Sequence, residues 1–286
     1  MEPQFIAAAN NWLSDHTALA PETVEALARV AGTLVSGIPP QRPVAIGVSG
    51  PPGTGKSTLA AVCAAALSDS GASCMVLSLD DYYLPRSARQ ALAADRHPLL
   101  ARRGAPGTHD IALLARHLAA LRNGPHGTLE LPRFDKSADN RAPQGRLLEA
   151  GPAPDFVFVE GWLVGVPAQA EQELDTAVNR LESELDADRA WRRYTNRRLF
   201  EYHQALAPLL DQLWHLDAPS WEQVVEWRWQ QEQANAQQWL TSRAETREFL
   251  ASYQRLGLHM HRSCGQWADA VVTLDHHHLP SIRPAP

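Results

Sequence analysis

GPPGTGKS (residues 50–57) is the stretch that decides the fold of this 286-residue chain. It matches G-x-x-x-x-G-K-[ST], a pattern whose backbone N–H groups surround phosphate groups. The apolar run PVAIGV (43–48) precedes it and indicates a buried strand, and KSTLAAVCAAALSDSG (56–71) follows it and indicates a helix that ends at Gly71. Strand, glycine-rich turn and helix are the context that the pattern requires. We therefore predict a phosphate-binding loop.

Each residue type in this loop has a physical reason. Pro51 and Pro52 lack N–H groups, so the hydrogen-bond donors must come mainly from residues 53–58. Glycines allow close approach of the backbone, and the helix N-terminus adds its positive dipole end. Lys56 is expected to reach the β- and γ-phosphates of ATP, and Ser57 to offer its hydroxyl to Mg²⁺. The predicted nucleotide-binding residues are Gly50, Gly53, Thr54, Gly55, Lys56, Ser57 and Thr58.

Outward from the loop, short apolar runs alternate with helical patterns. This alternation predicts a parallel sheet covered on both faces, that is, a three-layer α/β/α P-loop NTPase fold with helical additions. Residues 1–40 indicate two short helices, which we treat as an N-terminal extension to a P-loop domain at 41–286. The further strands are expected at 74–79, 155–161, 210–218 and 269–275, and helices at 110–124 and 220–240, while TLELPRF (128–134) begins as a strand and the tail after 275 is expected to fray.

Composition limits the classes of partner. The formal net charge is −6, without the clustered Lys and Arg that a nucleic-acid-binding surface needs. The N-terminus has no secretory signal pattern, and no run of 18 apolar residues predicts a membrane span. Three scattered cysteines (Cys63, Cys74 and Cys264) form no disulfide or zinc pattern. We expect a cytoplasmic protein with no nucleic-acid or membrane partner; its oligomeric state is not predicted.

Acidic residues follow two of the expected strands. Glu160 comes after four apolar residues, so we assign it to Mg²⁺, directly or through water. Asp80 is placed to accept the proton of a substrate hydroxyl, and Asp81 could do this instead. The alternative for either aspartate is a helix or turn cap, and spacing alone does not choose between them.

Five segments after the loop give the chain a specific resemblance. Together they are similar to the D-glycerate 3-kinase family of P-loop kinases, which are relatives of uridine kinase, phosphoribulokinase and bacterial pantothenate kinase. The resemblance covers roughly residues 40–275. Its segments are LSLDDYYL (77–84), RRGAPGTHD (102–110), LPRFDKSADNR (131–141), VEGWLVGV (159–166) and VEWRWQQE (225–232).

This resemblance implies an ATP- and Mg²⁺-dependent kinase that acts on a small acid, with D-glycerate yielding 3-phosphoglycerate. It implies that Asp80 is the base and that Glu160 belongs to the Mg²⁺ site. It also places the 102–110 and 131–141 segments at the acceptor pocket. The implied acceptor-binding residues are Asp80, Tyr82, Arg103, His109, Asp110, Arg133, Lys136 and Arg141.

The roles of His109, Asp110 and Arg228 need separate explanation. His109 and Asp110 could bind the acceptor hydroxyls, but Asp110 could equally cap the helix that follows it. Arg228 looks like the lid arginine of these kinases and would neutralise charge on the transferring phosphoryl group, together with Lys56. The tract at 276–278 (HHH) is expected in a solvated tail or beside the adenine rather than around a metal ion.

Two other functions compete with glycerate phosphorylation. One is a related kinase with another acceptor, such as a nucleoside, pantothenate or a sugar acid. The other is a regulatory P-loop NTPase, but its usual N-K-x-D base-reading motif does not occur in this sequence.

Overall fold

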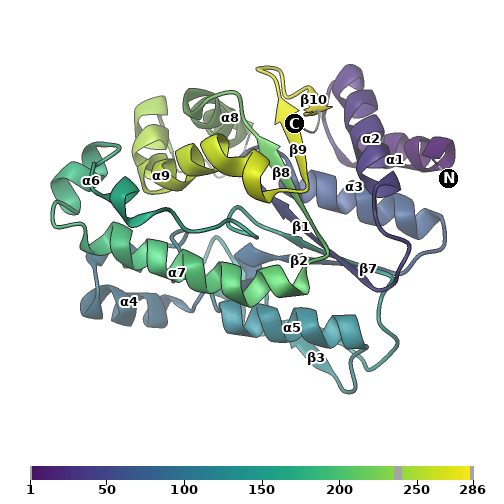
Figure 1. Cartoon of the computed structure of the whole chain (residues 1–286), viewed down its shortest axis with the longest axis horizontal. Helices are drawn as coiled ribbons and strands as arrows, with labels where there is room; N and C mark the ends of the chain where they lie inside the picture. Colours follow the sequence, from purple (N-terminus) through teal and green to yellow (C-terminus); the bar gives the residue numbers. More distant parts are fainter. Residues whose placement is uncertain (1, 235–239, 284–286) are drawn as a thin grey trace.

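A central sheet organises the protein (Figure 1). The computed structural model describes residues 2–234 and 240–283, and within these the sheet has six strands. All neighbouring strands pair in parallel except the two strands nearest the C-terminus, residues 270–274 and 280–282, which pair antiparallel. In spatial order the strands are β10 (Pro280–Ile282), β9 (Ala270–Leu274), β8 (Gln212–Asp217), β1 (Val44–Ser49), β7 (Phe156–Glu160) and β2 (Cys74–Ser78). The predicted, mostly parallel sheet is confirmed.

The register of the sheet brings the ends of several strands together. Strand β1 lies between β7 and β8, so the phosphate-binding loop that follows it leaves from the middle of the sheet. Glu160 is opposite Ser78 on β2 and opposite Val48 on β1, while Ser49 is opposite His215 on β8. Because parallel strands end at the same edge, the segments after β1, β2 and β7 all meet there.

Helices cover both faces of the sheet, as the alternating pattern predicts (Figure 1). On one face α3 packs against β1, β2 and β7, and α1 and α2 pack on α3. On the other face lie α5, which contacts β7 and α7, and α9, which contacts β8 and β9. The helices are α1 (Glu2–His16), α2 (Pro21–Ser36), α3 (Lys56–Asp69), α4 (Arg86–Asp95), α5 (Ile111–Asn123), α6 (Arg180–Leu185), α7 (Ala190–Leu206), α8 (Trp221–Ala234) and α9 (Arg243–Trp267), with a 3-10 turn η1 (Leu79–Tyr82) after β2.

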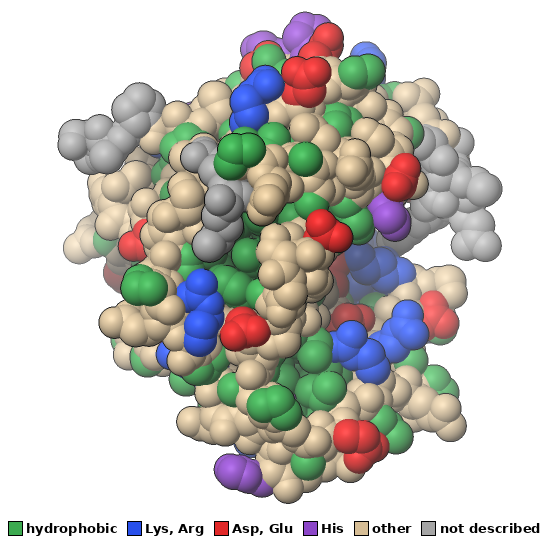
Figure 2. Space-filling model, turned by 90° about the vertical axis from the view of Figure 1, so that its right-hand side faces the viewer, with side chains coloured by type: hydrophobic (Ala, Val, Ile, Leu, Met, Phe, Trp, Pro, Cys, Tyr) green, Lys and Arg blue, Asp and Glu red, His purple; other side chains and the backbone are tan. Residues whose placement is uncertain are grey.

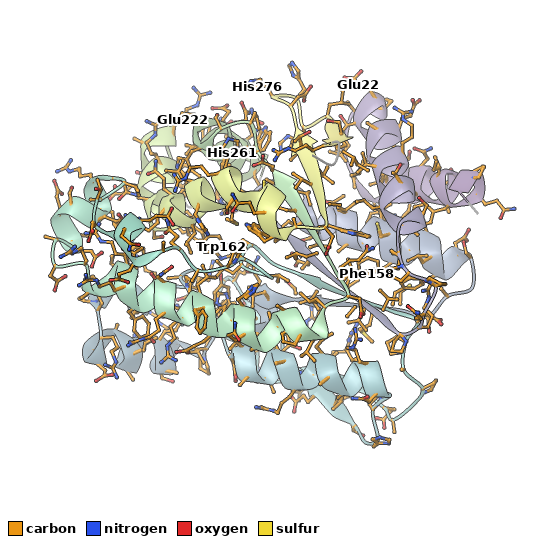
Figure 3. All side chains as sticks on the ribbon, viewed as in Figure 1. Glu22, Phe158, Trp162, Glu222, His261 and His276 are labelled. Atoms are coloured by element: carbon orange, nitrogen blue, oxygen red, sulfur yellow. The ribbon has the colours of Figure 1, made fainter. Side chains whose placement is uncertain are left out.

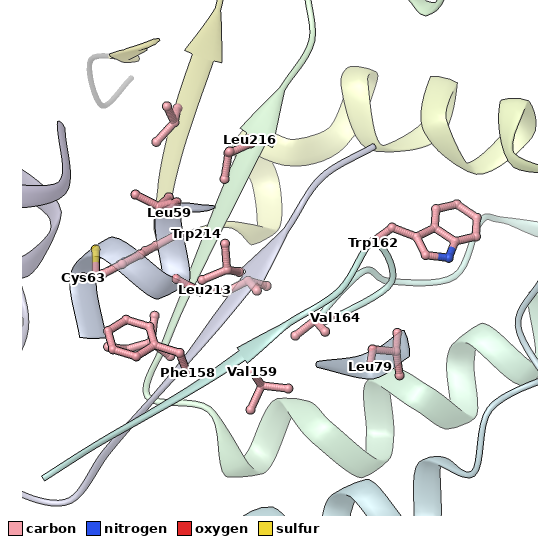
Figure 4. Packing of buried hydrophobic residues seen from close by; sticks show 14 of the residues in the cluster. Leu59, Cys63, Leu79, Phe158, Val159, Trp162, Val164, Leu213, Trp214 and Leu216 are labelled. Atoms are coloured by element: carbon pink, nitrogen blue, oxygen red, sulfur yellow. The ribbon is translucent and has the colours of Figure 1, made fainter. Parts of the chain in front are cut away.

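The hydrophobic core explains why the central strands are continuous apolar runs. Every residue of β1 and β7 is buried, as expected for strands with helices on both faces. The rings of Phe158 and Trp214 lie 6.1 Å apart in this core, with Leu59 of α3 above them (Figure 4). Phe5 of α1 and Leu27 of α2 belong to the same cluster. The two N-terminal helices therefore share the core of the sheet.

A buried ionic cluster joins α6, α7 and α9. The carboxylate of Glu182 is fully buried and accepts hydrogen bonds from Arg192 at 3.2 Å and from Arg255 at 2.7 Å. Arg192 also pairs with the buried Asp186 at 2.9 Å. Two guanidinium groups thus face two carboxylates, so burial leaves none of these charges without a partner.

The segment between α5 and β7 forms two small antiparallel pairs. Strand β3 (Leu129–Leu131) pairs with β6 (Arg146–Leu148), which confirms the strand predicted at 128–134. The second pair, β4 (Phe134–Asp135) with β5 (Asn140–Arg141), was not predicted. Its turn includes Asp139 with a φ of 47°, a left-handed conformation that Asp tolerates better than most residues.

The structure corrects the expectation for the C-terminal tail. Instead of fraying after residue 275, the chain turns at Asp275, whose carboxylate accepts hydrogen bonds from the backbone of His277 and Leu279, each at 2.8 Å. It then returns as β10 along β9, and residues 284–286 lie outside the described part of the chain. Of the helix expected at 220–240, α8 accounts for residues up to Ala234, and residues 235–239 lie outside the described part of the chain.

The surface carries mixed charge. On the face shown in Figure 2, basic and acidic side chains are interspersed, and several Lys and Arg side chains gather beside a hollow at the right of the view. Among the described residues, none of the helices combines the length and apolar character needed to cross a membrane.

Candidate active site

The phosphate-binding loop adopts the conformation that its glycines permit. Gly50, Gly53 and Gly55 have φ values of 147°, 81° and 85°, which side chains rarely allow. A Cβ on Gly50 would lie 2.5 Å from the carbonyl oxygen of Leu216. The Thr54 hydroxyl donates to the Pro51 carbonyl at 2.8 Å and holds the loop closed. The backbone from Gly53 onward thus leads directly into the first turn of α3.

Lys56 is the first residue of α3 and turns back over the loop. Its ammonium group donates to the Pro51 carbonyl at 2.9 Å. Burial lowers the pKa of Lys56, while the nearby Glu160 and Asp80 oppose that shift. The ammonium therefore lies between the phosphate-binding loop and two carboxylates, where it can contact a phosphoryl group.

A cavity of about 660 Å³ opens beside Lys56. It brings together residues from the strand ends, from the segment around β4 and β5, and from α8 and α9. Seven of the predicted site residues line it: Lys56, Ser57, Asp80, Arg103, Lys136, Glu160 and Arg228.

The two aspartates after β2 have different surroundings. Asp80 faces the cavity, and its carboxylate accepts a hydrogen bond from Lys136 at 2.8 Å. Burial alone would raise the pKa of Asp80, but Lys136, with smaller contributions from His109 and Lys56, lowers it overall. Asp81 instead accepts a hydrogen bond from the backbone N–H of Phe134 at 3.0 Å, and burial raises its pKa. Of the two aspartates, Asp80 thus faces the cavity, whereas Asp81 holds β4.

Glu160 ends β7 at the cavity and is mostly buried, with 7% of its surface exposed. The hydroxyl of Ser78 donates to its carboxylate and fixes its orientation. Ser57 lines the same cavity. A serine hydroxyl and an oriented carboxylate are the hard oxygen donors that Mg²⁺ prefers, so these residues fit a magnesium site.

Basic side chains enter the cavity from the β4–β5 turn and from the segment before α5. Arg103 donates to the Asp139 carboxylate at 2.7 Å and to the Lys136 carbonyl at 3.3 Å. Its guanidinium also lies 5.7 Å from the centre of the Phe134 ring. Arg103 is therefore held in place by the turn that also carries Lys136.

Arg228 reaches the cavity from α8. Its guanidinium donates to the side chain of Gln231 at 2.8 Å and to the buried carboxylate of Glu232, and it lies 5.7 Å from the centre of the Phe249 ring. Trp227, its neighbour on the helix, stacks on His278 at 3.8 Å between ring centres. Arg228 thus lies over a phenylalanine ring at the cavity wall.

The structure corrects the prediction for Tyr82. Its side chain is 1% exposed and its hydroxyl is hydrogen-bonded to Nδ1 of His117 at 3.0 Å, away from the cavity. The next residue, Tyr83, lines the cavity instead and stacks on His109 at 4.1 Å. Because η1 turns the chain, one residue of the pair enters the core and the other faces the site.

His109 and Asp110 lie behind that tyrosine rather than on the cavity wall. Burial lowers the pKa of His109 to about 3, and one ring nitrogen contacts the Tyr202 hydroxyl at 3.2 Å. Asp110 caps α5 by accepting a hydrogen bond from the backbone of Leu113 at 3.1 Å. Of the two interpretations of Asp110, the geometry favours the cap.

Two further predicted residues also lie outside the cavity wall. Arg141 donates to the Tyr83 carbonyl at 3.0 Å and lies 3.8 Å from Asp110, so it fastens β5 to η1. Arg133 is an exposed side chain between β3 and β4. Neither Arg133 nor Arg141 therefore lines this cavity.

Several lining residues were missed. Tyr83, Ser137, Trp162, Phe249 and Tyr253 all contribute to the cavity. Trp162 lies inside the molecule beneath α9, whereas His276 projects outward (Figure 3). Two signals were available: Tyr83 belongs to the segment that carries Asp80, and Trp162 directly follows the strand end at Glu160.

Comparisons with known proteins agree with this geometry. No family model matches the chain. An uncharacterized kinase of Schizosaccharomyces pombe, mug58, is 32% identical over 209 residues, which cover 68% of this chain and 72% of that protein. The chloroplastic D-glycerate 3-kinase of Arabidopsis thaliana is 30% identical over 165 residues, which cover 53% of this chain but 36% of that protein.

A solved structure shows the same fold. The D-glycerate 3-kinase of Cryptococcus neoformans var. grubii superposes with a TM-score of 0.65 at 23% identity, covering 90% of this chain and 99% of that one. The overall fold of this chain is thus shared with that solved structure.

Proposed function

The chain belongs to the D-glycerate 3-kinase-like family of P-loop kinases, and from this premise we propose that it transfers the γ-phosphoryl group of ATP to a hydroxyl of a small anionic hydroxy acid, with D-glycerate yielding 3-phosphoglycerate. The observation that carries the proposal is one shared cavity. Its wall joins Lys56 of the phosphate-binding loop, the carboxylate of Asp80, and the cations Arg103 and Lys136.

Ser57 and Glu160 would hold Mg²⁺. Their oxygens suit this ion, and they line the cavity beside Lys56. When bound, the ion neutralises negative charge on the phosphates. The hydrogen bond from the Ser78 hydroxyl keeps the Glu160 carboxylate in one orientation.

Asp80 supplies the base. The acceptor hydroxyl oxygen forms a bond to the γ-phosphorus while its proton passes to the Asp80 carboxylate, and the bond from the γ-phosphorus to the β–γ bridging oxygen breaks to release ADP. The lowered pKa of Asp80 keeps its carboxylate ionised near neutral pH, ready to accept the proton. Lys56 and Arg228 face the same cavity and neutralise charge on the transferring group.

Arg103 and Lys136 are the groups that would select an acid. A guanidinium matches a carboxylate in two-point geometry, and an ammonium adds a compact charge. Lys136 pairs with Asp80 at 2.8 Å and is otherwise largely exposed, so an acceptor carboxylate offers it a second partner beside the base. An acid bound in this way would have its hydroxyl near Asp80.

The test is ADP release measured with a panel of hydroxy compounds. We expect release to depend on D-glycerate, with 3-phosphoglycerate identified as the product by mass spectrometry. Glycerol is the matched control, because it keeps the hydroxyls and lacks the carboxylate. ADP release that is unaffected by every compound of the panel would contradict the kinase proposal and favour a regulatory NTPase.

One observation favours a second candidate, a kinase with a larger acceptor. A neighbouring cavity of about 750 Å³ shares Arg103, Lys136, Ser137 and Phe249 with the first and extends to Leu240. Together the two exceed what a three-carbon acid needs. Sugar acids, nucleosides and pantothenate therefore belong in the panel. If one of them gave a higher kcat/KM than D-glycerate, that compound would take the place of glycerate as the proposed acceptor.

A further inference from the structure

A second group of reactive side chains lies between β8 and α9, and none of them lines the cavity described above. His215 and Asp217 are two positions apart on β8, so their side chains share one face of the sheet. Cys264 comes from α9, which packs on β8. All three side chains are buried, and one nitrogen, one carboxylate oxygen and the sulfur lie within 4.8 Å of one another. Folding thus joins three metal-ligating groups that their spacing in the sequence does not connect.

His215 has a ring nitrogen to spare. Its side chain is fully buried, and Nδ1 is hydrogen-bonded to the Ser49 hydroxyl of β1 at 2.9 Å. Nε2 is also buried and has no hydrogen-bond partner among the residues that the structure describes. A buried polar atom without a partner is costly to keep, and a metal ion would satisfy it. A hydrogen bond at the opposite nitrogen, such as that with Ser49, is what orients a metal-binding imidazole.

A cation already lies between the other two groups. The guanidinium of Arg283 donates to the Asp217 carboxylate at 2.6 Å and to the Cys264 sulfur at 3.5 Å. The Arg283 side chain is partly exposed, and its backbone N–H is separately bonded to the Val271 carbonyl at 2.8 Å. The guanidinium can therefore move into solvent while β10 stays in place. The surroundings of Asp217 and Cys264 thus accommodate a positive charge that is free to exchange.

The ligand types select the ion. A thiolate, an imidazole and a carboxylate together suit Zn²⁺, whereas Mg²⁺ prefers oxygen ligands alone. Tetrahedral zinc holds its ligand atoms roughly 3.3–3.8 Å apart, so the group must close by about 1 Å, which side-chain rotation allows. Three protein ligands leave the fourth position to water. His261 of α9 (Figure 3) is half-exposed and hydrogen-bonded to Asp217 at 2.8 Å, and it orients this carboxylate from the solvent side.

We propose that His215, Asp217 and Cys264 form a zinc-binding site, and that the metal displaces Arg283 from it. As the sulfur–zinc bond forms, the Cys264 thiol releases its proton to solvent, and the Arg283 guanidinium leaves the Asp217 carboxylate. The inference does not depend on phosphoryl transfer. The site nevertheless adjoins the phosphate-binding loop, because Ser49 directly precedes Gly50.

The experiment uses the full chain, treated with a chelator and kept without nucleotide. Cobalt(II) is the spectroscopic probe, because a cobalt–thiolate bond gives a charge-transfer band in the near ultraviolet that nitrogen and oxygen ligands do not give. We expect a band that saturates at a single ion per chain and disappears when zinc is added. Cys264→Ala should abolish the band and weaken zinc at least about tenfold, measured by competition with a coloured chelator. Cys74→Ala, at a half-buried cysteine of β2, is the matched control and should change neither.

Arg283→Gln distinguishes a metal site from a purely structural cluster. It keeps the backbone bond to Val271 and removes the competing charge, so zinc should bind about tenfold more tightly. If Arg283 is only a structural partner, thermal stability falls and zinc affinity does not rise, and this result would overturn the inference even if Cys264→Ala does not fold.

The histidine tract at 276–278 is the competing place for a metal ion. A cobalt band that persists in Cys264→Ala, or a zinc affinity that is lost in His277→Ala and kept in Cys264→Ala, would also overturn the inference. None of these measurements involves an acceptor or ATP, so the proposed function can fail while the zinc site stands, and the reverse.

Discussion

Two cavities, of about 660 Å³ and about 340 Å³, meet at Lys56, and they differ in chemistry and in construction. The larger one has carboxylates, lysines and arginines on its wall, and these come from many elements, among them the 3-10 turn η1, the β4–β5 turn, the loop before α5 and helix α8. The smaller one has aliphatic walls that come from β9, β10 and the long helix α2. The larger cavity is therefore rich in side chains that can accept protons or neutralise charge, and the smaller cavity is an apolar space between regular elements.

This difference separates two kinds of effect. Interactions that strengthen only in the transition state raise kcat, whereas uniform binding of a remote group changes KM. We therefore expect substitutions in the larger cavity to act on turnover and those in the smaller cavity to act on donor affinity. The predictions below test this separation.

Replacing Asp80 should have the largest effect. Asp80→Asn removes the base, so kcat should fall about 10³-fold while ATP affinity stays within about twofold. Steady-state kinetics and calorimetry measure the two quantities. Asp81→Asn is the matched control: its carboxylate holds the Phe134 backbone, so it should lower thermal stability and leave most of the turnover. A larger loss of kcat in Asp81→Asn than in Asp80→Asn would reverse the assignment.

Arg228 comes next. Arg228→Met removes a cation from the cavity wall, and kcat should fall about 10²-fold with little change in ATP affinity. Arg243→Met provides the comparison, because Arg243, the first residue of α9, is exposed and pairs with Glu226 of α8 at 3.0 Å. Equal kinetics for the two variants would show that Arg228 only packs on Phe249.

The pH dependence of kcat should reveal the pairing of Asp80 with Lys136. Burial raises the pKa of Asp80, and Lys136 outweighs it and lowers that pKa, so turnover is lost only as the pH falls through a value below the usual carboxylate range. In Lys136→Met burial prevails, and the acidic limb should move to higher pH. Lys136→Arg keeps the charge and should keep the limb in place. If the acidic limb did not move in Lys136→Met at saturating acceptor, Asp80 paired with Lys136 would not be the group whose protonation limits turnover.

The smallest effect is expected on the donor side. His278→Ala removes the stack on Trp227 and the contact with Gly53, so KM for ATP should rise about threefold while kcat stays within about twofold. His276→Ala, at an exposed position of the same turn, should change neither value. A fall in kcat larger than the rise in KM would break the proposed separation.

Much of this architecture is readable from the sequence because it depends on local patterns. Buried strands such as 155–161 are continuous apolar runs, and the loop at 50–57 carries its own glycines and lysine. Glu160 and Ser57 line the same cavity because parallel strands, and the loop that follows β1, end at one edge of the sheet, which is a rule of topology rather than of spacing. The position of the cavity next to Lys56, at this edge of the sheet, follows largely from these facts.

The remaining features depend on contacts between distant segments. Tyr82 and Tyr83 are adjacent and chemically alike, and the direction of η1 decides which one enters the core. Arg141 and Arg103 are both arginines beside acidic residues, but the β4–β5 hairpin turns one toward the Tyr83 carbonyl and the other toward the cavity. The tail forms β10 because β9 offers it an unpaired edge, which its proline-rich sequence did not reveal.

The buried cluster around Glu182 divides helix α9 into two parts. Arg255 is fixed by Glu182 and by the carbonyl oxygen of Glu173, whereas the turns before it carry Phe249 and Tyr253 to the cavity wall. Amide hydrogens beyond Arg255 should therefore exchange with solvent only through large-scale unfolding, and those before Phe249 through local opening. A single continuous helix would then show two regimes of hydrogen exchange, with the boundary set by one buried carboxylate.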